Sequence, residues 1–267
     1  MSVLDNIIAQ RRVDVARAKG ARPAESLAEG LSPSRRDFRA ALARPGLSLV
    51  AEVKKKSPSR GPIRPDLDLA QLLALYHRHA DAVSVLTEDR HFGGSLEDLA
   101  AARRHTSLPL LRKDFIIDPY QVDEARAAGA DAVLLIVAAL DGGLLAELRD
   151  RAAALGMDAL VEVHDEGELQ RALDAGADII GVNNRNLKDL SIDLSVTERL
   201  APLVPEGRVV VADSGVARKE DALRMSRHAD AILVGSAILA AEEMPAKVKA
   251  LVYGSIKVCG ITRRPAA

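Results

Sequence analysis

The sequence predicts an α/β protein: a (β/α)8 (TIM) barrel that follows an N-terminal helical extension. Eight short apolar runs alternate with Ala-, Leu- and Arg-rich stretches that are long enough for a helix. Strands joined by such connections pair in parallel, because each crossover needs a dozen or more residues. The runs are 49–53, 82–86, 109–112, 132–137, 159–163, 178–182, 208–212 and 231–234.

A repeat favours closure of the sheet into a barrel. Each copy joins a helix end to a strand start through Gly or His, then Ala and Asp, which suit such a loop. The copies lie about 50 residues apart and so mark every second strand, as the alternate-strand layers of a barrel require. A doubly wound open sheet is the alternative, but it explains eight evenly spaced units less well. The copies are 79–83, 129–133, 176–180 and 228–232.

The chain before the first strand predicts helices. Helical spacing of apolar residues covers 3–19, and shorter helices are expected at 24–29 and 38–42, the last closed by Pro45 and Gly46. The predicted division is an extension at 1–48, a barrel at 49–253 and a tail at 254–267.

Composition excludes several classes of partner. The formal net charge of −1 and the 2% aromatic content give no reason to expect nucleic acid. No apolar run approaches the roughly 20 residues that span a membrane, and the N-terminus lacks a signal-peptide pattern. A single cysteine excludes an intrachain disulfide and is typical of the cytoplasm. We therefore expect a cytoplasmic protein without a nucleic-acid or membrane partner. As a separate expectation, the chain acts as a monomer on a small molecule.

Polar residues end several of the apolar runs. Glu52 and Lys54 follow the first run, Lys113 the third, Glu162 the fifth and Asn183 the sixth. Side chains alternate along a strand, so residues two apart share a face. Barrels place function at the carboxyl ends of their strands. Removing two lysines and two acids from water costs free energy, unless these side chains face each other, water or a ligand.

These charges suit acid–base chemistry. Lysine and glutamate in a partly buried mouth shift each other's pKa. Lys113 as a protonated acid and Glu162 as its complementary base is the natural pairing. Two other interpretations remain open: Lys54 or Lys113 is a Schiff-base nucleophile, as in barrel aldolases, or 54–56 is an exposed basic strand end.

The last two strands predict a phosphate site. Glycines that follow them and open a helix make a cradle of backbone N–H groups. Hydroxyls of the first loop can add donors. The candidate residues are Ser57, Ser59, Ser214, Gly215, Gly235 and Ser236.

The histidines do not predict a metal site. His77 and His79 lie two apart on a predicted helix and do not share a face. For His164, which follows the fifth run, an ordinary solvated histidine is favoured over one that lines the mouth. No nucleotide-binding glycine motif follows a strand.

Four segments together resemble indole-3-glycerol phosphate synthase: 51–61, 111–115, 160–163 and 181–187. The likeness runs from the N-terminal helices to about Leu251, and it implies that these helices cover the barrel mouth. It implies a phosphorylated substrate, 1-(2-carboxyphenylamino)-1-deoxyribulose 5-phosphate. The implied reaction closes a five-membered ring and loses CO₂ and water, with no cofactor or metal.

The resemblance also implies roles for the strand-end residues. Lys113 is the general acid of ring closure and Glu162 the acid–base partner of dehydration. Lys54 holds the substrate carboxylate, while Glu52 and Asn183 orient these groups. Further implied contacts are Arg185 at the carboxylate, Ser57, Gly215, Gly235 and Ser236 at the phosphate, and Phe92, Phe115, Leu134, Leu187 and Leu233 around the anthranilate ring.

Two features depart from the family pattern. Asp213 stands where the family usually has Glu, which puts the role of that position in doubt. The segment 257–263 resembles the first strand of phosphoribosylanthranilate isomerase, whose general base would be Cys259. This predicts a fused isomerase domain in a longer protein, of which the chain is the front piece.

Two other functions remain open for the barrel. One is a Schiff-base aldolase that acts on a phosphosugar. The other is a non-catalytic barrel that binds a phosphate ligand or docks to a partner. The set of Lys113, Glu162 and Asn183 favours catalysis over the second alternative.

Overall fold

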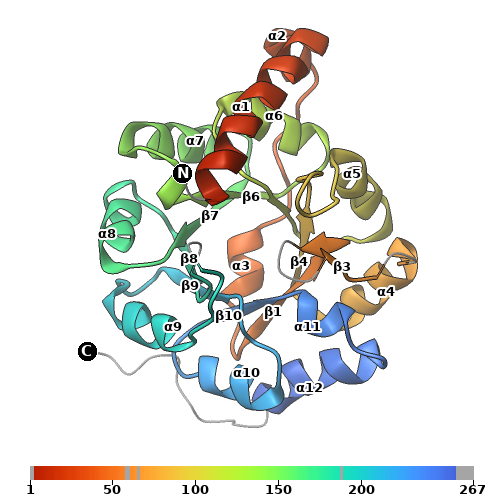
Figure 1. Cartoon of the computed structure of the whole chain (residues 1–267), viewed down its shortest axis with the longest axis vertical. Coiled ribbons are helices and arrows are strands. Elements are labelled where there is room, and N and C mark those ends of the chain that lie inside the picture. Colours follow the sequence, from red (N-terminus) through yellow and green to blue (C-terminus); the bar gives the residue numbers. More distant parts are fainter. Residues whose placement is uncertain (1–2, 58–60, 65–66, 187–188, 257–267) are drawn as a thin grey trace.

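In the computed structural model, eight parallel strands close into a barrel in the order β1-β10-β9-β8-β7-β6-β5-β4 (Figure 1). The structure describes residues 3–57, 61–64, 67–186 and 189–256. Ser59, Leu187 and Cys259 of the sequence predictions lie outside these residues. The predicted (β/α)8 barrel is confirmed, and the open-sheet alternative is wrong because β1 pairs with both β4 and β10.

The strands begin and end within one residue of the predicted apolar runs. A two-stranded hairpin, β2 (Lys56–Ser57) with β3 (Gly61–Pro62), adds to the first loop. The barrel strands are β1 (Ser48–Val53), β4 (Ala82–Leu86), β5 (Leu110–Lys113), β6 (Ala132–Ile136), β7 (Asp158–Val163), β8 (Ile179–Asn183), β9 (Val209–Asp213) and β10 (Ala231–Val234).

Helices form the outer ring (Figure 1). Several begin at an Asp or Ser whose side chain accepts a hydrogen bond from the first turn, as at Asp68, Ser95 and Asp141. None in the described part of the chain is long and apolar enough to cross a membrane. The ring helices are α4 (Leu69–His79), α5 (Leu96–His105), α6 (Pro119–Ala127), α7 (Gly142–Ala154), α8 (Glu166–Asp174), α9 (Ser195–Leu200), α10 (Lys219–Met225), α11 (Ser236–Leu239) and α12 (Met244–Ile256), with 3₁₀ turns η1 (Val137–Ala139) and η2 (Ala201–Leu203).

Alternation along the strands separates two cores. Val50, Leu111 and Leu160 point into the barrel and pack in one cluster. Their neighbours, such as Ala51 and Val161, point outward and pack beneath the helices. The residue two positions after each of these inward residues therefore also faces the barrel axis, at the carboxyl ends of the strands.

The extension reaches both ends of the barrel. Its helices are α1 (Val3–Ala21), α2 (Ala24–Ala28) and α3 (Phe38–Leu42). Phe38 and Leu42 of α3 join the inner cluster, and the Arg39 N–H donates to Asp158 at the start of β7. Only α1 lies at the mouth, whereas α3 closes the opposite end (Figure 1). The expectation that all leader helices cover the mouth was therefore wrong for α3, which is drawn in by its buried apolar residues.

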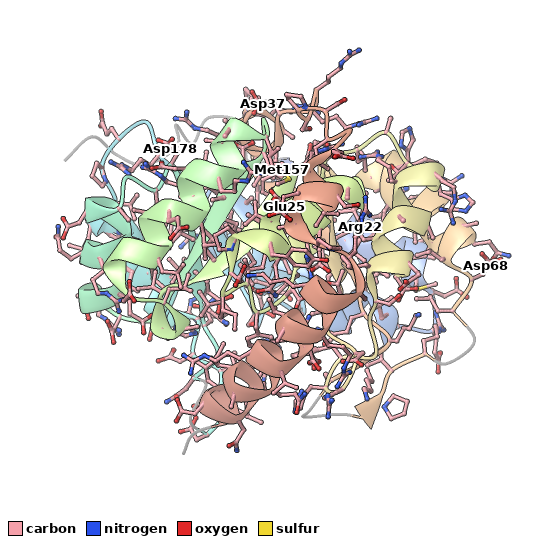
Figure 2. All side chains as sticks on the ribbon, turned by 90° about the horizontal axis from the view of Figure 1, so that it is seen from above. Arg22, Glu25, Asp37, Asp68, Met157 and Asp178 are labelled. Atoms are coloured by element: carbon pink, nitrogen blue, oxygen red, sulfur yellow. The ribbon has the colours of Figure 1, made fainter. Side chains whose placement is uncertain are left out.

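The repeated aspartate connects neighbouring strands. The Asp81 carboxylate accepts the Leu49 N–H at 2.9 Å, and the Asp230 carboxylate accepts the Val210 N–H at 2.9 Å. Asp131 accepts from Leu110 in the same way. Each aspartate thus satisfies a backbone donor at the start of the neighbouring strand. Asp178, the fourth copy, is exposed at the edge of the molecule (Figure 2) and uses its backbone carbonyl instead.

Replacement of one such carboxylate tests this role. We expect Asp230→Ala to lower the free energy of unfolding by about 1–3 kcal/mol, because it leaves the buried Val210 N–H without its acceptor. Asp178→Ala, at the exposed copy, is the matched control and should change little. Urea denaturation measures both, and an equal loss in the two variants would contradict the role.

Candidate active site

A cavity of about 500 Å³ opens at the carboxyl ends of the barrel strands. The strand ends form its floor, and Leu4 and Ile7 of α1 form part of its wall. Ser59 and Leu187 lie outside the described residues. The other predicted site residues all line it: Glu52, Lys54, Ser57, Phe92, Lys113, Phe115, Leu134, Glu162, Asn183, Arg185, Ser214, Gly215, Leu233, Gly235 and Ser236.

The floor of the cavity holds a chain of opposite charges. The Lys113 ammonium forms an ion pair with Asp213, and its Nζ lies 4.0 Å from Oε2 of Glu52. Glu52 in turn pairs with Lys54 through its other oxygen. Glu52 on β1 and Asp213 on β9 are buried, and Lys113 on β5 is partly buried. Their mutual pairing offsets the cost of removing them from water.

The acids keep Lys113 charged. Burial lowers the pKa of Lys113, but the charges of Asp213 and Glu52, with that of Glu162, outweigh burial and raise this pKa above its usual range. Lys113 is therefore a cation across neutral pH. A Schiff-base nucleophile must be a neutral amine, so this arrangement disfavours that role for Lys113.

Glu162 has the opposite character. Burial raises the pKa of the Glu162 carboxyl, and the positive charge of Lys113 opposes this without cancelling it. Asn183 forms a side-chain hydrogen bond to the carboxyl. A carboxyl with a raised pKa exchanges its proton closer to neutral pH, which suits a group that both accepts and donates protons.

Sequence reasoning left Asp213 out of the predicted site, although the structure places it at the centre. Its carboxylate is the ion-pair partner of Lys113 and is buried. The alternation of side chains along the strand could have indicated this position. Asp213 ends β9 two residues after Val211, which points into the barrel, so the two side chains share a face. The strand register also sets it beside Asn183.

His164 differs from its prediction as a solvated histidine. Its Nε2 is buried and lies 3.6 Å from Oε1 of Glu162. Its Nδ1 lies 2.9 Å from Glu168 on α8. The residue is not among those that line the cavity, so it contacts the site from behind Glu162.

Apolar side chains form the wall above the charges. The rings of Phe92 and Phe115 lie 6.3 Å apart at 38° to each other. Leu134 and Leu233 belong to the inner cluster, against which Phe115 packs, and line the same cavity. An aromatic ring fits such a wall, and the exclusion of water strengthens the charge interactions beneath it.

Two buried carboxylates hold the phenylalanine loops. Glu88 accepts the backbone N–H of His91 at 2.7 Å and of Phe92 at 3.0 Å. Asp114 accepts the backbone N–H of Phe115 at 2.8 Å. Sequence reasoning did not single out Glu88 or Asp114, because no local pattern marks a carboxylate that binds loop N–H groups.

The end of the cavity beside β9 and β10 lacks room for larger side chains. A Cβ on Gly235 would lie 2.2 Å from Oε1 of Glu52, and Gly215 has a φ of +90°. Arg218 and Lys247 also line this end and were missed by the sequence analysis. Backbone N–H groups, hydroxyls and cations together suit a phosphate.

Ser57 adds an unsatisfied hydroxyl to the cavity. Its Oγ is buried and has no hydrogen-bond partner among the described residues. A bound polar ligand would supply one. Within the described ranges, no group of three or more His, Cys, Asp and Glu side chains is arranged to hold a metal ion.

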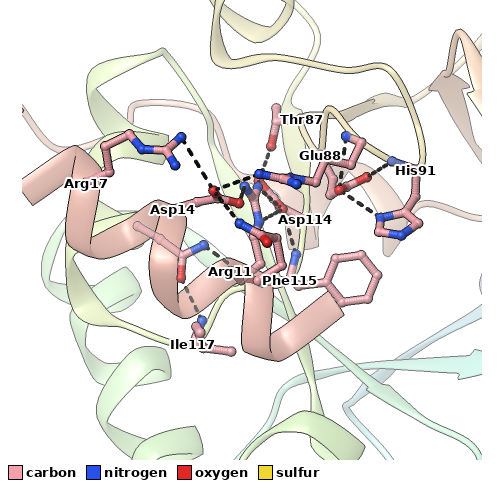
Figure 3. A network of polar contacts seen from close by, with 12 residues as sticks. Arg11, Asp14, Arg17, Thr87, Glu88, His91, Asp114, Phe115 and Ile117 are labelled. Atoms are coloured by element: carbon pink, nitrogen blue, oxygen red, sulfur yellow. Dashed lines mark hydrogen bonds and ion pairs between the residues drawn. The ribbon is translucent and has the colours of Figure 1, made fainter. Parts of the chain in front are cut away.

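The extension is fixed to the site through Asp114 (Figure 3). Arg11 of α1 donates to both oxygens of this buried carboxylate. Thr87 donates to it at 2.5 Å and Arg112 at 3.0 Å. Burial alone would raise the pKa of Asp114, but the charges of Arg112 and Arg11 lower it to about 2. The residue before Asp114 is Lys113, so α1 is anchored one residue from the charged floor.

Loss of that anchor should be costly. We expect Arg11→Met to lower the free energy of unfolding by about 2 kcal/mol, because Asp114 stays buried with one cation fewer. Arg17→Met is the matched control, since Arg17 is largely exposed on the same helix. Urea denaturation of both variants measures the difference. Equal stability of Arg11→Met and the parent would contradict the anchoring role.

The family model for indole-3-glycerol phosphate synthase matches residues 4–251. Indole-3-glycerol phosphate synthase 2 of Streptomyces coelicolor is 48% identical over 254 residues, which cover 94% of this chain and 98% of that one. The synthase of a Parafrankia species is 51% identical over 241 residues, which cover 89% of this chain and 90% of that one.

Solved structures of other enzymes share the barrel. A thiamine phosphate pyrophosphorylase from Pyrococcus furiosus matches with a TM-score of 0.60 and 19% identity, over 84% of this chain and 100% of its own. A 3-hexulose-6-phosphate synthase from Salmonella typhimurium matches with a TM-score of 0.63 and 15% identity, over 79% and 99%. Identities this low show the fold alone.

The family match covers almost the whole barrel and the N-terminal helices. The two synthases share about half of their residues with this chain across nearly their full length. The chain belongs to the indole-3-glycerol phosphate synthase family.

Proposed function

We propose that the cavity converts 1-(2-carboxyphenylamino)-1-deoxyribulose 5-phosphate to indole-3-glycerol phosphate, a step of tryptophan biosynthesis. The observation that carries this proposal is Lys113, held as a cation by Asp213 and Glu52 on the floor of an apolar cavity. The reaction needs such a cation where charge develops on a carbonyl oxygen. Loss of CO₂ makes the enzyme a carbon–carbon lyase.

The substrate has three parts, and the cavity offers a region for each. The anthranilate ring fits between Phe92, Phe115, Leu134 and Leu233. The phosphate fits against the loops after β9 and β10, with Ser57 as a further donor. The ring carboxylate is left near the cations Lys54 and Arg185, of which Arg185 is steadied by a 3.0 Å bond to the Leu190 carbonyl.

Ring closure is the step for Lys113. The ring carbon that bears the carboxylate attacks the ketone carbon, and Lys113 gives its proton to the ketone oxygen as the carbon–carbon bond forms. That oxygen becomes a hydroxyl instead of an alkoxide. Departure of CO₂ then returns an electron pair to the ring and restores its aromaticity.

Dehydration is the step for Glu162. The new hydroxyl leaves as water once it receives a proton, and the neighbouring carbon loses a proton to complete the indole. A carboxyl with a raised pKa suits this exchange. Glu52 and Asn183 orient the two groups through their contacts with Lys113 and Glu162. Because side chains supply acid and base, the proposal calls for no cofactor or metal.

Action as a monomer stays a prediction. The near-neutral net charge supports a small molecule, not nucleic acid, as the partner. The single cysteine fits a cytoplasmic location. The fused isomerase domain stays a prediction, since residues 257–267 lie outside the described ones.

Two substitutions test the chemical roles together. In Lys113→Ala and Glu162→Gln we expect kcat to fall at least about 100-fold, because each removes a proton-transfer group. The readout is indole fluorescence after the substrate is mixed with the purified protein. A folded parent that binds the substrate without turnover would instead indicate a non-catalytic barrel. An adduct on Lys54 or Lys113 trapped by borohydride would indicate the aldolase.

Asp213 can be tested by its effect on the pH profile. Asp213 raises the pKa of Lys113, so Asp213→Asn should lower that pKa and move the basic limb of kcat to lower pH. We expect kcat itself to fall about 10- to 100-fold, a loss typical of partners that orient a catalytic group. In Asp213→Glu the basic limb of kcat should stay at the pH of the parent. Asp178→Asn, at an exposed position, is the control. An unchanged limb in Asp213→Asn would contradict the role.

A further inference from the structure

Glu162 has a histidine behind it that the proposed mechanism does not use. His164 follows β7 directly, and its side chain is 16% exposed. Its Nε2 is buried, lies 3.6 Å from Oε1 of Glu162 and has no hydrogen-bond partner among the described residues. The free nitrogen therefore faces the proposed acid–base carboxyl from outside the cavity.

Glu168 sets the form of this histidine. Its Oε2 accepts the backbone N–H of His164 at 2.8 Å and lies 2.9 Å from Nδ1 of the ring. An ionised carboxylate only accepts hydrogen bonds, so Nδ1 carries a proton. In the neutral ring, Nε2 then presents its lone pair to Glu162.

We propose that His164 is a positioning residue that shares one proton with Glu162 and connects it, through Glu168, to the surface. This inference rests on the proposed function of Glu162. The proton on the Glu162 carboxyl moves to Nε2 of His164, which leaves a carboxylate and an imidazolium. The imidazolium then gives its Nδ1 proton to Glu168, which passes it to water at the surface, and the reverse path restores the Glu162 carboxyl. The two atoms must approach by about 0.7 Å to reach hydrogen-bond distance.

The surrounding charges support a shared proton. Lys113 and Asp213 face Glu162 from β5 and β9, and Glu168 faces His164 from α8. Burial lowers the pKa of His164, but the hydrogen bond to Glu168 and the charge of Glu162 outweigh it and raise this pKa. The pKa of Glu162 is raised as well. Both groups therefore hold a proton more firmly than they would in water, which supports a proton shared between them.

Such a connection serves the turnover of a buried group. Glu162 is 3% exposed and lines the cavity, so a substrate in the cavity would cover that side of its carboxyl. Glu168 is 17% exposed in its side chain and reaches the surface. His164 thus offers Glu162 a way to regain its starting protonation state while the cavity is occupied.

His164→Asn tests the transfer, because Asn keeps a donor for Glu168 and lacks Nε2. We expect kcat to fall about 10-fold with KM within about twofold. Loss of the imidazolium raises the pKa of Glu162 further, so the acid limb of kcat should move to higher pH. In the Glu162→Gln background, His164→Asn should cost nothing more. His228→Asn is the matched control, since His228 lies 3.9 Å from Glu198 away from the cavity.

Equal losses from His164→Asn in the parent and in Glu162→Gln would overturn the inference, as would an unmoved acid limb. A second readout needs no turnover: NMR titration of the His164 ring. We expect Glu162→Gln to lower the pKa of His164, and an unchanged pKa would overturn the inference by itself. If instead the parent shows this coupling but no turnover of the substrate, the proposed function fails and the pairing stands.

Discussion

The ion pair between Lys113 and Asp213 is the interaction on which the site depends. Lys113 lies in an apolar cavity, where a lone ammonium would lose its proton. Asp213 and Glu52 keep the proton in place from two other strands. Lys113 and Asp213 then act on Glu162, and the charge of Asp213 also acts on His164. The charge of the proposed acid, Lys113, therefore also acts on the proposed acid–base carboxyl of the site.

The fold provides this arrangement in two ways: side chains alternate along each strand, and the helices of the extension hold the two ends of the barrel. Inward residues fill the barrel interior, and on β1, β5, β7 and β9 the next inward position is polar and faces the cavity. The extension then fixes both ends: Phe38 of α3 fills one, and Arg11 of α1 binds Asp114 beside the other. The anchor of α1 and the proposed proton transfer are therefore coupled, because Asp114, which Arg11 binds, is the residue next to Lys113 in the chain.

The barrel and its strand ends were predictable because their signals are local. Apolar runs, helix caps and period-two phase are read within a few residues, and they placed Lys113 and Glu162 at the cavity. Asp213 obeyed the same phase but was set aside as a departure from the family pattern. Contacts such as Arg11 with Asp114, 103 residues apart, depend on tertiary packing that no local pattern encodes.

The most direct test of this account is the titration of the Lys113 ammonium itself, followed by NMR of the labelled side-chain nitrogen. Asp213 and Glu52 should hold it protonated beyond pH 10.5, the ordinary value for lysine. A signal that stays that of a charged amine through this range is the predicted result. Deprotonation near pH 8 would contradict the account, because Lys113 would then be a neutral amine that is suited to a Schiff base and not a protonated general acid.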